Sequence, residues 1–183
     1  MDITSLNLKE LLELQTLVRR ELKTKHHWLD KERPNWDMYF SMMTQVVATR
    51  GSCCRRRVGA ILVDKDYNTL ATGYNGKGAG LVNCLERPCE GAYMASGEGL
   101  SRCEAIHAEI NALIRCRDAR EVYTAYVTCS PCVECVNALL GTGCKRIVFT
   151  EEYAHNGESK RRWLSSPGRE WVYMDMSESH IDT

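Results

Sequence analysis

The first part of the chain alternates apolar and polar residues at helical intervals. Leucine and valine recur every three or four positions over residues 7–27, and Asn7 and Glu10 have the spacing of a capping box. Residues 36–47 repeat this pattern and would place their apolar side chains on one face. The pattern predicts two amphipathic helices.

From Val58 onward the period changes to that of strands. Two short apolar runs, 58–63 and 69–74, flank a polar turn and predict an antiparallel hairpin. Beyond a long irregular stretch, predicted helices and strands alternate: helix 107–117, strand 122–128, helix 132–140, strand 146–150, helix 158–164 and strand 171–174. Such alternation implies parallel crossovers and a sheet covered on both faces. We predict an α/β fold with three α/β/α layers and a mixed sheet of about five strands.

The polar stretch between the first two predicted helices ends in Arg33-Pro34-Asn35, which is typical of a boundary. We therefore expect an N-terminal helical extension over residues 1–35 and one domain over residues 36–183. Charged residues interrupt the first fourteen positions, and no apolar run reaches the roughly 18 residues of a membrane span. We expect a cytoplasmic protein without a membrane contact.

Composition limits the classes of function. The chain has 24 Lys plus Arg and 24 Asp plus Glu among 183 residues, so no overall charge attracts a long polyanion. A small phosphorylated substrate needs only a local basic pocket and stays compatible. The chain also has ten cysteines. In a reducing compartment these indicate metal binding rather than disulfides.

The candidate chemistry lies in His107 and in the Cys132–Cys135 pair. Two cysteines three positions apart at a predicted helix start can reach one ion, and a histidine at another helix start makes a third ligand. Structural zinc sites usually have four protein ligands, whereas three leave a position for water. Water on a catalytic zinc can have a pKa of ~7, which makes hydroxide available at neutral pH. The set predicts a catalytic zinc.

Glu109 supplies a second requirement, a proton carrier. Hydrolytic deamination needs a proton moved to the ring nitrogen and another to the leaving amine, and one carboxylate beside the attacking water can move both. A Cys-x-x-Cys pair alone more often marks a structural zinc half-site or a redox pair. Redox chemistry would not explain His-x-Glu on a different predicted helix, so the combination favours a catalytic zinc site with a proton carrier.

These elements together resemble the cytidine and deoxycytidylate deaminase superfamily, whose zinc enzymes carry this signature. The resemblance covers about residues 36–175 and rests on these segments: Arg50-Gly51-Ser52-Cys53, Val58-Gly59-Ala60, Gly73-Tyr74-Asn75-Gly76, His107 to Ala112 and Tyr126 to Cys132. It implies deamination of dCMP to dUMP and ammonia by zinc-bound hydroxide, with Glu109 as the proton shuttle. It also implies that the product supplies thymidylate synthesis.

The resemblance also implies substrate-binding roles. Asn75 would contact the sugar, Arg50 or Ser52 the phosphate, the backbone of Ala108 the base edge, and Tyr153 would close over the ring. An arginine with a serine hydroxyl is a sensible phosphate clamp. Each position also has a simpler interpretation: an exposed cation at a helix end, a plain Asn-Gly turn, or edge packing by the tyrosine.

The irregular segment 75–104 is rich in glycine and contains three cysteines. By resemblance, Cys53, Cys84, Cys89 and Cys103 would hold a second, structural zinc, with Cys54 as an alternative to Cys53. The resemblance also suggests a hexamer that dCTP activates and dTTP inhibits, with Asn75, Gly76 and Gly80 near the effector. The chain departs from the family pattern at Gly51, where a serine is usual, and in the register of Cys103.

Two other functions stay open at this point. A related zinc deaminase could act on another cytosine nucleoside or nucleotide, including 5-modified dCMP, or on nucleic acid. Nucleic acid would need a basic groove, for which Arg55-Arg56-Arg57 and Lys160-Arg161-Arg162 are candidates, although both are more simply solvated faces. A non-catalytic zinc-binding module would keep the cysteines but would have no use for Glu109.

Overall fold

The computed structural model describes residues 7–25, 33–94, 98, 102–153 and 156–176. Helix α1, Leu8–Lys25, lies in a unit separate from the fold that begins at Asn35. It starts at the predicted capping box: the Asn7 backbone N–H donates to Glu10 Oε2 at 2.9 Å, and the Glu10 N–H donates to Asn7 Oδ1 at 3.1 Å. Two N–H groups at the helix start are thereby satisfied.

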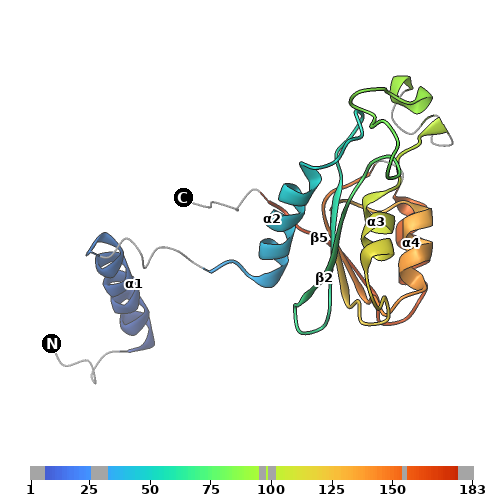
Figure 1. Cartoon of the computed structure of the whole chain (residues 1–183). Helices are drawn as coiled ribbons and strands as arrows, with labels where there is room; N and C mark the ends of the chain where they lie inside the picture. Colours follow the sequence, from blue (N-terminus) through green and yellow to red (C-terminus); the bar gives the residue numbers. More distant parts are fainter. Residues whose placement is uncertain (1–6, 26–32, 95–97, 99–101, 154–155, 177–183) are drawn as a thin grey trace. The chain divides into compact units, whose positions relative to one another are not determined.

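The main fold is built on a five-stranded sheet in the order β2-β1-β3-β4-β5 (Figure 1). Its strands are β1 (Gly59–Val63), β2 (Thr69–Tyr74), β3 (Thr124–Cys129), β4 (Arg146–Glu151) and β5 (Glu170–Tyr173). Strand β1 pairs antiparallel with both β2 and β3, whereas β3, β4 and β5 run parallel. The predicted hairpin and mixed sheet are confirmed.

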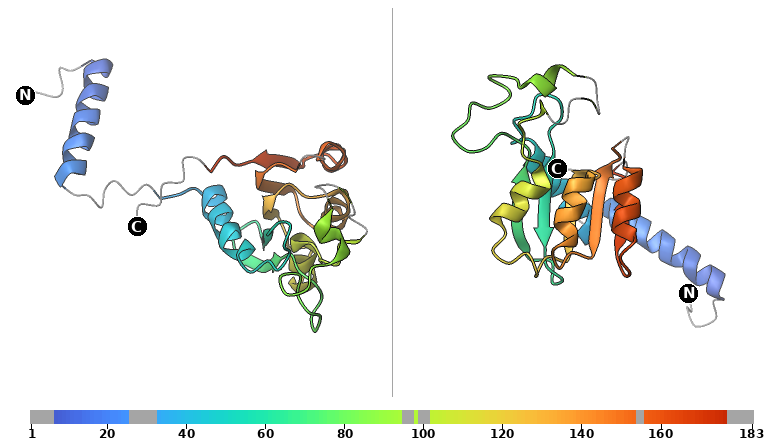
Figure 2. Two further views of the ribbon diagram at one scale, coloured as in Figure 1. Left: turned by 90° about the horizontal axis from the view of Figure 1, so that it is seen from above. Right: turned by 90° about the vertical axis from the view of Figure 1, so that its right-hand side faces the viewer.

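Helices cover both faces of the sheet, as predicted. Helix α2, Trp36–Ala48, packs on one face, where its Phe40 joins Ile61, Val63, Tyr126 and Val148 in a buried cluster. The opposite face carries α3 (Ala108–Arg115), α4 (Val133–Leu140) and α5 (Gly157–Leu164), which lie side by side in Figure 2. The larger core lies beneath these three helices and includes Leu62, Val127, Leu139, Phe149 and Trp163. A short 3-10 helix, η3 (Glu90–Tyr93), lies in the irregular segment.

Helix α3 lies unusually close to β2, and a glycine makes this approach possible. A Cβ atom at Gly73 would lie 2.2 Å from the carbonyl oxygen of Ala108 and 2.4 Å from the backbone nitrogen of Ala112. No side chain other than hydrogen fits there. Gly73 therefore sets where α3 begins on the sheet.

The edge formed by the carboxyl ends of β3 and β4 is where α4 begins, because α4 follows β3 after a short turn. In sheets with parallel strands this edge is the usual place for a ligand site. Among the described residues, no helix is long and apolar enough to cross a membrane.

Candidate functional site

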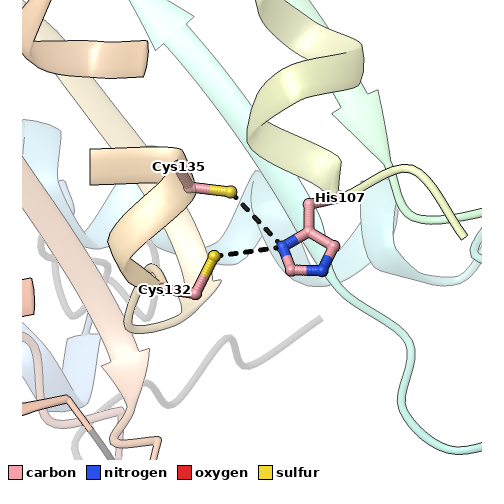
Figure 3. A group of neighbouring side chains, drawn as sticks. All are labelled: His107, Cys132 and Cys135. Carbon is pink, nitrogen blue, oxygen red and sulfur yellow. Dashed lines mark hydrogen bonds between the residues drawn. The ribbon is translucent and has the colours of Figure 1, made fainter. Parts of the chain in front are cut away.

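His107, Cys132 and Cys135 meet at this edge of the sheet (Figure 3). His107 is the N-cap of α3 and Cys132 the N-cap of α4, and Cys135 lies one turn into α4. The Nδ1 atom of His107 lies 3.3 Å from the Sγ of Cys132 and 3.4 Å from the Sγ of Cys135. Among the described residues, these are the only three potential metal ligands whose donor atoms all lie within 4.8 Å of one another.

In the metal-free cluster Cys132 is already ionised, whereas His107 and Cys135 must each release a proton when a metal binds. A hydrogen bond from the Cys135 thiol, reinforced by His107, lowers the pKa of Cys132 to about 3. In turn the hydrogen bond to Cys132 raises the pKa of His107 to about 9. Cys132 is therefore a thiolate at neutral pH, the form in which cysteine binds metal. One imidazole and two sulfurs match the donor set of a catalytic zinc with one remaining position.

Glu109 lies two residues after His107, in the first turn of α3, where residues at this spacing can face one site. Its side chain is 4% exposed and hydrogen-bonds with Cys135. Burial raises the pKa of the Glu109 carboxyl above its ordinary value, an effect that the charge of His107 partly offsets. A buried carboxyl with a raised pKa, placed beside the candidate metal ligands, is suited to accept and release a proton during a reaction.

The cluster opens into a pocket of about 930 Å³. Of the substrate residues expected from sequence, Asn75, Ala108 and Tyr153 line this pocket. Arg50 and Ser52 do not line it. Arg50 follows the end of α2 and is exposed, and the side chain of Ser52 lies beneath Gly76, where a Cβ would approach its Oγ to 2.6 Å.

The side chain of Asn75 braces the chain ahead of β1. Its Oδ1 accepts a hydrogen bond from the Val58 backbone N–H at 2.9 Å, and its Nδ2 donates to the Arg56 carbonyl at 2.8 Å. Gly51 leaves room for it, since a Cβ there would lie 2.7 Å from Asn75 Oδ1. This contact gives a physical reason for glycine where the family pattern has serine.

Arg56 and Cys129 also line the pocket, although the sequence indicated Arg56 only as part of a basic groove for nucleic acid and did not indicate Cys129. Arg56 Nη1 donates to the Sγ of Cys129 at 2.8 Å, and the guanidinium lies 5.9 Å from the centre of the Tyr153 ring. These contacts join three distant segments, so no local pattern reveals them. The one available signal was the position of Arg56 directly ahead of a strand that leads to the Asn75 loop.

Four cysteines of the segments 53–54 and 84–103 contact one another in sequence. Cys84 and Cys89 are buried with their sulfurs 3.6 Å apart, and Cys103 hydrogen-bonds with Cys89. Cys54, not Cys53, hydrogen-bonds with Cys84. Burial raises the pKa of Cys84 and of Cys103, whereas a backbone N–H from Glu104 lowers the pKa of Cys89.

Comparison with known proteins identifies relatives. Residues 34–151 match the family described as cytidine and deoxycytidylate deaminase zinc-binding region. The deoxycytidylate deaminase of Mycobacterium phage D29 is 40% identical over 126 residues, which cover 66% of this chain and 98% of that protein. The deoxycytidylate deaminase of Saccharomyces cerevisiae is 34% identical over 129 residues, which cover 69% of this chain but only 41% of the yeast protein.

A solved structure shares the fold. The dCMP deaminase from the cyanophage S-TIM5, in complex with dCMP and dUMP, superposes with a TM-score of 0.61 at 24% sequence identity, covering 79% of this chain and 100% of that one. The family match contains the candidate metal ligands, Glu109 and the strands that present them. This chain therefore belongs to the cytidine and deoxycytidylate deaminase zinc-binding family.

Proposed function

We propose that the protein hydrolyses dCMP to dUMP and ammonia. The observation that carries this proposal is the buried carboxyl of Glu109 beside the His107, Cys132 and Cys135 cluster, within one pocket. The names of the phage and yeast relatives support deoxycytidylate as the substrate, and so does the neighbouring structure that holds dCMP and dUMP.

His107, Cys132 and Cys135 would hold a zinc ion. When bound, zinc lowers the pKa of water and supplies a nucleophile at neutral pH. The imidazole contributes no charge when neutral and the two thiolates balance the ion, so the site can be filled without burying a net charge.

Glu109 would move the protons of the reaction. Water adds at the ring carbon that bears the amine, a carbon–oxygen bond forms, and the carbon–nitrogen bond to the amine breaks. Glu109 takes a proton from the water, delivers one to the ring nitrogen and passes another to the departing ammonia. Its raised pKa brings the protonated and ionised forms closer in free energy, which suits a group that must alternate between them.

Two other pocket residues would orient the base. Ala108 is the first residue of α3, where backbone N–H groups lack helical partners and can meet a base edge. Tyr153 lies on the pocket wall, with its backbone N–H donating to Ser130 Oγ at 2.7 Å, and its ring would close over the pyrimidine.

A substrate panel tests this function. Ammonia release is measured from dCMP, deoxycytidine, 5-methyl-dCMP and a single-stranded oligonucleotide, with zinc-loaded protein. We expect the highest kcat/KM on dCMP. A preference for the unphosphorylated nucleoside or for the oligonucleotide would contradict the proposal.

Cys84, Cys89 and Cys103, together with Cys53 or its alternative Cys54, are candidates for a second, structural zinc. Pairwise contacts link Cys54 to Cys84, Cys84 to Cys89 and Cys89 to Cys103 without any disulfide, but the sulfurs are not all within 4.8 Å of one another. A zinc ion would draw the thiolates together and so hold the long irregular segment in place. We expect about two zinc ions per chain, falling to about one in Cys84→Ser. Cys144→Ser, which changes a buried cysteine of the core, is the control and should leave the count unchanged.

Regulation completes the proposal. We expect a hexamer that dCTP activates and dTTP inhibits through the loop that contains Asn75, Gly76 and Gly80. Asn75 belongs to the pocket wall, and Gly80 has a φ of +83°, a conformation that favours glycine. Sedimentation gives the oligomeric state, and dCMP saturation curves with and without dCTP test the effect. Hyperbolic curves that dCTP does not change would contradict it.

A further inference from the structure

Arg56 is a cation on the pocket wall to which the proposed chemistry assigns no task. It is exposed, it precedes β1, and its guanidinium lies between Cys129 and the ring of Tyr153. A guanidinium stays protonated at every pH relevant to an enzyme. The pocket therefore has a permanent positive charge on its wall.

This charge forms no ion pair within the described part of the chain. No carboxylate among the described residues lies within 4.0 Å of the Arg56 guanidinium, and its hydrogen-bond partner there is the Cys129 thiol. Burial raises the pKa of Cys129, so the thiol stays neutral and is a weak acceptor. Most of the five N–H donors of Arg56 thus remain available to a ligand.

The neighbouring arginines are placed differently. Arg55 lines the pocket but donates to the backbone carbonyl of Glu98 at 3.2 Å. Arg57 and Arg50 are exposed and do not line the pocket. Arg56 combines a place on the pocket wall with contacts to Cys129 and Tyr153.

The backbone of Arg56 is also fixed. The amide of Asn75 donates to its carbonyl at 2.8 Å and accepts from the N–H of Val58 at 2.9 Å. The Asn75 side chain is 8% exposed, so these hydrogen bonds are shielded from water and hold the segment in one conformation. A cation on a fixed backbone is preorganised for a ligand.

We propose that Arg56 binds the 5′-phosphate of a nucleoside monophosphate and so sets the preference for nucleotide over nucleoside, with Asn75 as its positioning residue. This inference rests on the proposed function and deepens it. A phosphate dianion matches a guanidinium in charge and accepts two parallel N–H bonds from it. A nucleoside offers no group that needs this cation.

The test compares Arg56→Gln with Arg57→Gln and Arg50→Gln, each zinc-loaded. For Arg56→Gln we expect kcat/KM on dCMP to fall about 100-fold, with deoxycytidine changed less than about twofold. Arg56→Lys keeps the positive charge but lacks the paired N–H donors. Its kcat/KM on dCMP should be about tenfold higher than that of Arg56→Gln. The two control variants should change neither substrate by more than about threefold. The proposal would be overturned if Arg56→Gln left the ratio of kcat/KM on dCMP to kcat/KM on deoxycytidine unchanged. It would also be overturned if Arg50→Gln, rather than Arg56→Gln, lost activity on dCMP.

Binding separates this inference from the proposed reaction. Calorimetry with dUMP and with deoxyuridine measures phosphate recognition without turnover. If wild-type protein releases no ammonia but binds dUMP through Arg56, the reaction is wrong and the phosphate site stands. If wild type binds dUMP and deoxyuridine equally, the phosphate site is wrong whatever the activity.

The role of Asn75 has its own readout. A residue that positions Arg56 affects only ligands that carry phosphate, whereas a sugar contact affects both ligands alike. We expect Asn75→Ala to weaken dUMP binding about tenfold and to leave deoxyuridine binding unchanged. Equal weakening of both ligands would assign Asn75 to the sugar and remove its positioning role.

Discussion

The Nδ1 atom of His107 lies 3.3 Å from the Sγ of Cys132, although 25 residues separate the two in sequence. Each residue is the N-cap of its helix, so the site is assembled by two helix starts that meet at one edge of the sheet. The ends of rigid elements position ligands better than loops do. The geometry of the metal site is therefore a property of the fold as a whole.

Removing one ligand should remove the metal. In Cys132→Ser we expect the loss of one zinc ion per chain and of ammonia release from dCMP, because a hydroxyl is a poor replacement for a thiolate on zinc. Cys116→Ser, at the end of α3, is the matched control and should keep both. Metal analysis and the activity assay are read on the same preparation. Full zinc content in Cys132→Ser would contradict the ligand assignment.

Glu109→Gln should separate metal binding from turnover. The amide is nearly isosteric but cannot move a proton, so we expect zinc content to persist while kcat falls about 1,000-fold. Glu134→Gln is a demanding control, since Glu134 lines the same pocket from α4 yet is exposed. It should change kcat less than about threefold. Comparable losses in both variants would point to a general effect of charge instead of proton transfer.

How far the sequence predicts this molecule depends on the range of the interactions. The elements follow from local patterns: the Asn7–Glu10 capping box forms, and the strands near Val58 and Arg146 lie within a residue of their predicted starts. The metal site follows from a motif whose spacing is itself the constraint. The phosphate clamp predicted at Arg50 or Ser52 does not line the pocket.

The reason is physical. Residues 50–58 have no regular secondary structure, so no period tells which arginine faces inward. The position of Arg56 depends on Asn75, Cys129 and Tyr153, which come from three other segments. Such contacts arise only once the sheet has formed, and a single sequence does not encode them in any local signal.

Gly73→Ala should damage the site from a distance. The added methyl would lie 2.2 Å from the carbonyl oxygen of Ala108, so α3 must move away from β2 and carry His107 and Glu109 with it. We expect a loss of about 3 kcal/mol in stability and a marked loss of activity, typical of overpacking against backbone. Gly157→Ala is the control, because nothing lies within 4 Å of a Cβ at that position. Chemical denaturation measures the stability and the ammonia assay measures the activity. A Gly73→Ala enzyme with wild-type stability and activity would contradict this account of α3.

The ion pair between Asp37 and Arg146 should make the free energy of unfolding depend on pH in the acidic range. Arg146 donates to Asp37 through two nitrogens, at 3.1 and 2.9 Å, and the Tyr126 hydroxyl donates to it at 2.7 Å. Burial alone would raise the pKa of Asp37. The hydrogen bonds from Arg146 and Tyr126, together with the charge of Arg146, outweigh burial and lower this pKa below 3.8. When the pKa of a carboxyl is lower in the folded than in the unfolded protein, its ionised form stabilises the fold. This stabilisation is complete above the unfolded-state pKa and is lost as the pH falls through the folded-state pKa.

Asp37→Asn should therefore be less stable than wild type by about 1–3 kcal/mol at neutral pH, since it leaves half-buried Arg146 with only Glu170. The difference should narrow as the pH falls from 3.8 through the lower pKa of folded Asp37, because the wild-type carboxyl then becomes protonated. Asp118→Asn is the control, because Asp118 pairs with its near neighbour Arg120 at the surface and should leave the melting temperature unchanged at both pH values. Melting curves of the three proteins at neutral and acidic pH measure the effect. A difference that stays constant down to acid would show that Asp37 acts through packing, because only the charged form holds Arg146 by the ion pair.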